Sequence, residues 1–118
     1  LIGVEIHESG HFYVPMTINT DERTWTWMDE GINSFLDSIA KYEWDPDMPW
    51  RGRIPADVIG YMTSQNQVPI MTHADSVLRF GPNAYTKPSA ALNILRDTVI
   101  GRERFDFALK DFARRGMF

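Results

Sequence analysis

Apolar side chains recur along much of this chain at the spacing of an α-helix. The clearest set follows the polar loop 19–23 and consists of Met28, Ile32, Phe35, Leu36 and Ile39. These positions fall at i, i+4, i+7, i+8 and i+11, so they would form one stripe along a helix. The pattern predicts a helix that buries this stripe against the rest of the chain.

Four further helices are predicted around this one. The first runs from Leu1 to about Val14 and is stopped by Pro15, and Gly10 within it allows a neighbour to approach closely. The others are expected at 55–63, from an N-cap at Thr86 through Val99, and from about Glu103 to Arg115 with Phe105, Ala108, Leu109 and Phe112 on its buried face. Only Val68 to Thr72 has any strand character. The predicted fold class is therefore all-α, with about five helices.

The composition and charge of the chain mainly exclude classes of function. The 118 residues suit a single domain, and a net charge of −4 argues against nucleic acid as a partner. No apolar run has the length of a membrane span. There is no cysteine, so a zinc site would have to use histidine and carboxylate ligands.

The segment His7-Glu8-Ser9-Gly10-His11 has the H-E-x-x-H pattern within a predicted helix. The i, i+4 spacing places both imidazoles on one face, where they can share a metal ion. Glu8 then lies beside the open coordination position, where a carboxylate can accept a proton from water. The motif alone is also compatible with a helix that carries two hydrogen-bonded histidines and a surface glutamate.

Glu30 follows His11 with eighteen residues between them, at the start of the next predicted helix. Two histidines and one glutamate form a ligand set that catalytic zinc uses, with the fourth position left to water. This arrangement resembles the gluzincin aminopeptidases of the M1 family. The resemblance extends through residues 21–31 and reaches Asn83-Ala84-Tyr85-Thr86-Lys87-Pro88, which is similar to the Tyr-x-Lys segment of that family.

The resemblance implies a thermolysin-like zinc-helix core. It implies His7, His11 and Glu30 as ligands to one Zn²⁺, Glu8 as general base and Tyr85 as the group that stabilises the oxyanion. From the residues alone, a core tyrosine that shares a helix face with Leu92 is the favoured reading of Tyr85, and only the resemblance reverses it.

Several other residues have weaker functional readings. Asp29 precedes Glu30 and is either an outer partner of a ligating histidine or a solvated helix carboxylate. His73 has no partner at metal-ligand spacing and is read as a loop histidine. Two further groups are read as structural: the tryptophans Trp25, Trp27, Trp44 and Trp50 as packing residues, and 51–53 as a solvated loop.

The chain also departs from the family pattern. Glu5 stands where an apolar residue is usual, and Pro88 stands where glycine is common. The Gly-x-Met-Glu-Asn segment that binds the substrate amino terminus is missing. Residues 1–118 are therefore expected to be one fragment of a larger catalytic domain, with little activity of its own. We also expect it to self-associate through apolar surface, with Phe12, Tyr13, Trp25, Phe80 and Phe118 at the interface.

The expected function is zinc-dependent hydrolysis of peptide bonds at peptide amino termini. Two alternatives stay open: another zinc hydrolase on the same ligands, such as an endopeptidase or epoxide hydrolase, and a non-catalytic helical module. Localisation does not follow from the sequence, although the resemblance points to a periplasmic or membrane-associated parent protein.

Overall fold

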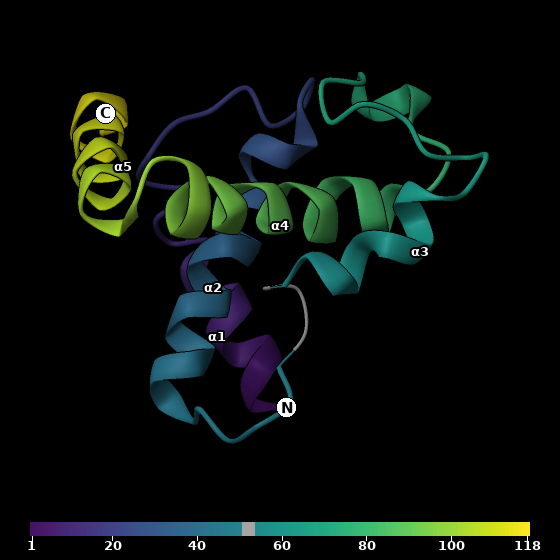
Figure 1. Ribbon diagram of the computed structural model, residues 1–118. Helices are drawn as coiled ribbons and strands as arrows, with labels where there is room; N and C mark the ends of the chain where they lie inside the picture. The colour runs from purple at the N-terminus through teal and green to yellow at the C-terminus, as the bar shows by residue number, and fades with distance from the viewer. Residues whose placement is uncertain (51–53) are drawn as a thin grey trace.

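The computed structural model describes residues 1–50 and 54–118, and within them the fold is all-α, as predicted (Figure 1). Five α-helices form the framework, and one of them, α4, has a π-helical turn at each end. The helices are α1 (Ile2–Gly10), α2 (Glu30–Trp44), α3 (Ile59–Met62), α4 (Lys87–Ile94) and α5 (Arg102–Gly116). Single helical turns lie between them: η1 (Thr26–Met28), η2 (Pro55–Val58), η3 (Ala74–Ser76), η4 (Pro82–Thr86) and η5 (Leu95–Val99).

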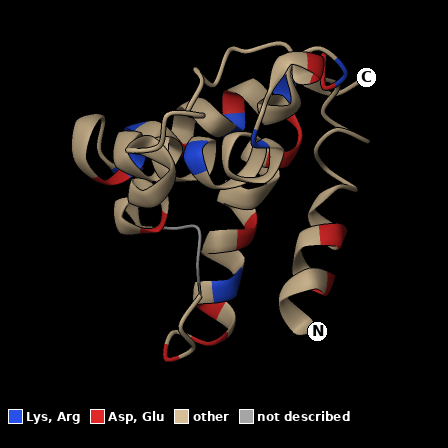
Figure 2. Ribbon diagram, turned by 90° about the vertical axis from the view of Figure 1, so that its right-hand side faces the viewer, with Lys and Arg blue, Asp and Glu red and all other residues tan. Residues whose placement is uncertain are grey.

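Helix α2 occupies the centre of the fold and packs against both α1 and α4. The predicted stripe explains this position, because Ile32 and Phe35 are buried and Leu36 packs against the core. The ring of Phe35 meets Phe105 of α5 edge to face, with 5.4 Å between their centroids. Figure 2 shows α1 and α2 side by side, with acidic residues but no lysine or arginine on α1.

Two glycines allow the central helices to come this close. A Cβ atom at Gly10 of α1 would lie 1.9 Å from Oδ1 of Asn33, and one at Gly31 of α2 would lie 2.5 Å from Cγ of Pro88. Neither distance leaves room for a side chain. Glycine is therefore needed on α1 where it meets α2, and on α2 where it meets α4. The predicted close approach at Gly10 is thus confirmed, and its partner is Asn33.

The first predicted helix is too long by four residues. Helix α1 ends at Gly10, and residues 11–17 form turns in which the amide of Tyr13 donates to the carbonyl of Gly10 at 2.9 Å. Pro15 has no amide hydrogen and disfavours the helical conformation of the residue before it. The chain therefore leaves the helix well before the proline itself.

The fourth predicted helix begins where expected as an α-helix, with Thr86 at the N-cap position of α4, but a π-helical turn precedes it. The helical path already includes η4, so Thr86 lies inside it and makes no side-chain capping bond. Pro82 occupies the first turn of this longer helical path, where its missing amide hydrogen costs nothing, and Pro88 lies in the first turn of α4 itself. The π-helical turn at η4 is the feature that the periodicity of Leu92, Leu95 and Val99 could not indicate.

Two smaller expectations are also corrected. Val68 to Thr72 does not form a strand, because its backbone is hydrogen-bonded to side chains. The carbonyl oxygen of Val68 accepts hydrogen bonds from the side chains of Asn83 and Lys87. On α5 only Phe105 is buried, while Phe112 is 39% exposed and Ala108 is exposed as well. Among the described helices, none combines the length and apolar character needed to cross a membrane.

Candidate metal centre

The two histidines of the H-E-x-x-H segment face α2 from one end of α1. His7 lies inside the helix and His11 lies just past its last residue, with 4.9 Å between the ring centroids. Helical spacing brings both rings to the same side, as predicted. Both side chains are largely buried, at 15% and 19% exposure.

Glu30, the first residue of α2, completes a group of three potential ligands. Its Oε2 lies 3.2 Å from Nε2 of His7 and 3.3 Å from Nε2 of His11. One ligand atom from each of the three residues lies within 4.8 Å of the others. His7, His11 and Glu30 thus converge on one point and are the only such triad among the residues that the structure describes.

The donor set and its outer contacts fit zinc. The Nδ1 atom of His7 lies 2.7 Å from Oδ2 of Asp37, and Nδ1 of His11 lies 2.9 Å from the carbonyl oxygen of Val14. With an acceptor opposite each Nδ1, both rings turn Nε2 toward Glu30. Ligating histidines characteristically have this arrangement, with the far nitrogen donating to a carboxylate or carbonyl.

Asp29 lies close to His11 but does not share its hydrogen bond. Its Oδ1 is 2.9 Å from Nδ1 of His11, yet that buried oxygen has no hydrogen-bond partner, because the ring N–H is directed at Val14. The contact is therefore electrostatic. Burial raises the pKa of Asp29 to about 6, against the lowering effect of His11, and the nearby charge of Glu30 adds to the increase.

The electrostatic environment also affects His11 itself. Burial lowers its pKa, but the carbonyl of Val14 and the carboxylates of Asp29 and Glu30 outweigh burial, so the pKa is raised above 6.5. The site without a metal therefore attracts positive charge, which is the electrostatic requirement for binding a divalent cation.

Tyr85 and Glu8 lie beside the triad from different elements. Tyr85 belongs to η4, its ring centroid is 5.8 Å from that of His7, and its hydroxyl is near the carboxylate of Glu30. Burial first, and then the nearby carboxylate of Glu30, raise the pKa of Tyr85 above its usual value. Its hydroxyl consequently stays protonated and can donate a hydrogen bond at neutral pH.

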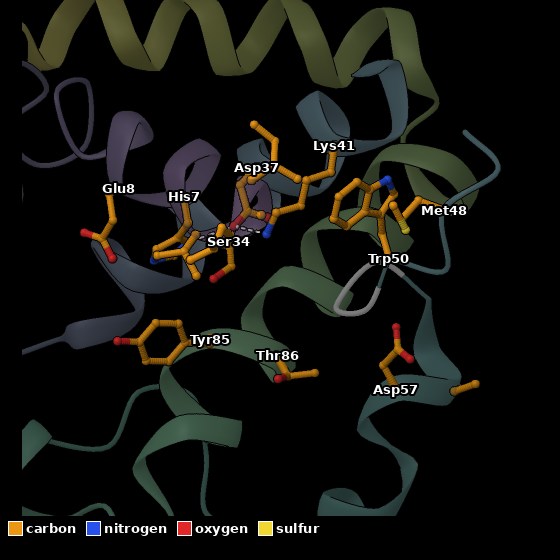
Figure 3. Close-up of a pocket in the computed structure, with 15 residues that line it drawn as sticks. His7, Glu8, Ser34, Asp37, Lys41, Met48, Trp50, Asp57, Tyr85 and Thr86 are labelled. Carbon is orange, nitrogen blue, oxygen red and sulfur yellow. Dashed lines mark hydrogen bonds and ion pairs between the residues drawn. The ribbon is translucent and has the colours of Figure 1, made fainter. Parts of the chain in front are cut away.

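An open cleft of about 940 Å³ leads to this group of residues (Figure 3). Glu8 is exposed and lines the cleft together with His7 and Tyr85. Figure 3 shows Tyr85 across the cleft from His7 and Glu8, with Met48 and Trp50 at the other end. A molecule in the cleft would therefore meet a carboxylate, a phenol and one candidate metal ligand, His7, together.

The sequence reading missed three polar residues of α2 that support the site. Asp37 bonds His7, and Lys41 donates to Asp37 at 2.9 Å. Asn33 donates to the backbone carbonyl of His7 at 2.8 Å, which ties α1 to α2. The position of Asp37 could have been predicted from its spacing, because it lies two helical turns after Glu30 and so shares the same face of the helix. The apolar stripe lies on the opposite face of α2 and therefore gave no indication of this residue.

The residues read as structural are placed as follows. His73 caps η3, where its Nδ1 accepts from the amide of Asp75 at 3.2 Å, and it is not part of the triad. Trp27 packs against the core, Trp50 lines the cleft and Trp44 is 69% exposed, so the packing role holds for only some of the tryptophans. The loop predicted at 51–53 lies outside the described residues.

Comparison of the chain with family models, with curated proteins and with solved structures finds no match.

Proposed function

We propose that this chain is the zinc-binding core of a metallopeptidase, and that it resembles the catalytic domain of the gluzincin aminopeptidases. The observation that carries the proposal is the convergence of His7, His11 and Glu30, with Nε2 of both histidines turned inward. Three ligands with an open approach from a cleft are characteristic of catalytic zinc, whereas structural zinc sites close the fourth position with protein.

When bound, zinc supplies a Lewis acid that acidifies water and polarises a carbonyl group. His7, His11 and Glu30 would hold it, and their outer contacts keep the imidazole rings turned toward it. The protein groups that act on the substrate itself are then Glu8 and Tyr85, which share the cleft with His7.

Glu8 is the proposed general base. Its carboxylate accepts a proton from the attacking water as the oxygen–carbon bond forms, and it passes this proton to the amine as the carbon–nitrogen bond breaks. An exposed carboxylate on the cleft wall suits this role, because it needs access to both water and the leaving group.

Tyr85 is the proposed donor to the oxyanion. Its ring lies beside His7 and its hydroxyl is near Glu30, so during the reaction it would donate to the substrate oxygen. A phenol whose pKa is raised is suited to donation because it remains protonated, and it brings no charge of its own.

The experiment that tests this function is the substitution Glu8→Gln in the longest active form of the protein. We expect turnover of an aminoacyl substrate to be lost while zinc remains bound, because the amide keeps the shape but cannot accept the proton. Normal turnover with zinc bound would contradict the role of Glu8. Absence of zinc from the unaltered protein would contradict the function as a whole and would favour a non-catalytic helical module.

Substrates with free and acetylated amino termini separate the hydrolase alternatives. A requirement for the free amine supports an aminopeptidase. Equal cleavage of both forms supports an endopeptidase on the same ligands.

A further inference from the structure

Two side chains bind the π-helical turn η4 to the segment 67–69, which is distant in sequence. Asn83 is 2% exposed, and its amide donates to the carbonyl oxygens of Val68 at 2.9 Å and of Pro69 at 3.3 Å. The half-buried Lys87 donates through Nζ to the same carbonyl oxygen of Val68. Both side chains therefore anchor η4 and the start of α4 to one short stretch of backbone.

Tyr61 of α3 and Gln67 complete this cluster. The hydroxyl oxygen of Tyr61, which is 5% exposed, accepts from the side-chain amide of Asn83 and from the backbone amide of Val68, both at 3.2 Å. Nζ of Lys87 donates to Oε1 of Gln67 at 2.9 Å. Hydrogen bonds from a charged donor are roughly twice as strong as those between neutral groups, so Lys87 adds strength to the anchor.

The spacing of these residues places the anchor and the phenol on opposite sides of one helical turn. Residues four apart on a helix lie on the same face, and residues two apart point in nearly opposite directions. Asn83 and Lys87 accordingly both meet the segment 67–69, while Tyr85, midway between them, faces the cleft and His7 (Figure 3). A rotation of the turn that released the anchor would therefore also turn the phenol away from His7.

The backbone of η4 has the hydrogen-bond pattern of a π-helix, which is rare and occurs mostly as single turns at functional sites. The amide of Lys87 closes this turn on the carbonyl of Pro82, five residues back. On another side the turn lies against α2, where Pro88 fills the space beside Gly31. Apolar packing of that kind has no preferred direction, whereas hydrogen bonds do. The bonds of Asn83 and Lys87 are thus the contacts that specify how the turn is rotated.

We propose that Asn83 and Lys87 are positioning residues for Tyr85. By anchoring η4 to the segment 67–69, they hold the phenol beside His7 at the mouth of the candidate metal centre. The proposal rests on the proposed function only in giving Tyr85 a part in turnover, since the placement of its ring is a property of the metal-free chain.

The first test measures the position of the Tyr85 ring in the metal-free chain by NMR. The ring centroids of Tyr85 and His7 are 5.8 Å apart, which brings their ring protons close enough for a nuclear Overhauser effect. We expect this effect to be weakened or lost in Asn83→Ala and in Lys87→Met. Lys87→Arg keeps a charged donor and should retain it. An unchanged effect in both Asn83→Ala and Lys87→Met would overturn the proposal, whether or not the chain binds zinc.

Arg79→Met is the matched control. Cζ of the exposed Arg79 lies 5.7 Å from the ring centroid of Tyr61, the same distance as Nζ of Lys87. The substitution removes a positive charge from the same ring but keeps both donors to the segment 67–69, so the nuclear Overhauser effect should persist. Its loss in Arg79→Met as well would assign the effect to charge beside Tyr61 and overturn the anchoring role.

The second test measures turnover in an active form of the enzyme. Misplacement of a reacting group by about 1 Å can cost about 100-fold, so Asn83→Ala and Lys87→Met should lower kcat by about 10- to 100-fold with zinc affinity unchanged. In a Tyr85→Phe background either substitution should cost less than about threefold, because the hydroxyl that it positions is gone. Equal losses in both backgrounds would overturn the positioning role.

The two tests separate this proposal from the proposed function. Normal turnover in Tyr85→Phe would contradict the catalytic part of Tyr85, and the nuclear Overhauser effect would still decide whether Asn83 and Lys87 place its ring. If Asn83→Ala fails to fold by circular dichroism, Lys87→Met and Lys87→Arg decide both tests.

Discussion

The contact between Gly10 and Asn33 allows a quantitative test of how α1 is held against α2. A methyl group at position 10 would lie 1.9 Å from Oδ1 of Asn33 and 2.9 Å from its Cγ. Asn33 is fully buried and donates to the carbonyl of His7 at 2.8 Å, so it cannot withdraw without breaking that bond. Gly10→Ala must therefore push the two helices apart or displace Asn33.

The expected cost follows from two opposing terms. Overpacking of a filled interior costs about 1–3 kcal/mol. Replacing glycine by alanine within a helix stabilises the folded state by about 0.5–1 kcal/mol. Because the clash is severe, we expect net destabilisation of about 1–2 kcal/mol, together with weaker zinc binding as His11 moves relative to Glu30.

Urea denaturation of the metal-free chain measures the first effect, and chelator competition measures the second. Gly60→Ala is the control, since nothing lies within 4 Å of a Cβ atom there, and it should be neutral or stabilising. In an Asn33→Ala background, Gly10→Ala should cost much less, because the clashing oxygen is gone. If Gly10→Ala is as stable as Gly60→Ala and binds zinc normally, the packing argument is wrong.

Three further outcomes are expected. Tyr85→Phe in an active form of the enzyme should lower kcat and kcat/KM together by roughly 10²–10³, and an increase in KM alone would make Tyr85 a binding residue. Zinc affinity should fall by at least about tenfold per pH unit below the pKa of His11, which is raised above 6.5, because protons compete with the metal for the imidazole nitrogens. Competition titrations from about pH 5 to about pH 8 check this, and a flat profile would exclude histidine as a ligand. The chain should self-associate with increasing concentration through apolar side chains such as Phe12 and Phe118, which are 73% and 100% exposed, and light scattering that shows a monomer throughout would contradict this.

Periodicity predicted the parts of the fold in which one helix face is buried. The stripe through Ile32 and Phe35 predicted α2 correctly, because residues that are buried on one face of a helix must be apolar at helical spacing. Periodicity failed where backbone geometry decides the structure. The π-helical turn that carries Tyr85 and the early end of α1 at Gly10 are features of the backbone that the spacing of apolar residues does not indicate.

The candidate site divides in the same way. The candidate triad could be predicted because helical spacing and a recognisable motif place His7 and His11 together. The partners behind them could not, because Asp37 and Lys41 look like ordinary charged residues on a helix until α1 is packed against them. The third partner, the carbonyl of Val14, is a backbone atom and so has no sequence signature at all.

The central claim is that His7, His11 and Glu30 bind one zinc ion and leave a position open. X-ray absorption spectroscopy of the zinc-loaded chain, combined with metal analysis after dialysis, tests it most directly. We predict one zinc per chain with two nitrogen ligands at about 2.0–2.1 Å, the remaining ligands being oxygen, and loss of that zinc in Glu30→Ala. A chain that retains no zinc, or one whose zinc content is unchanged when Glu30 is removed, would contradict the account.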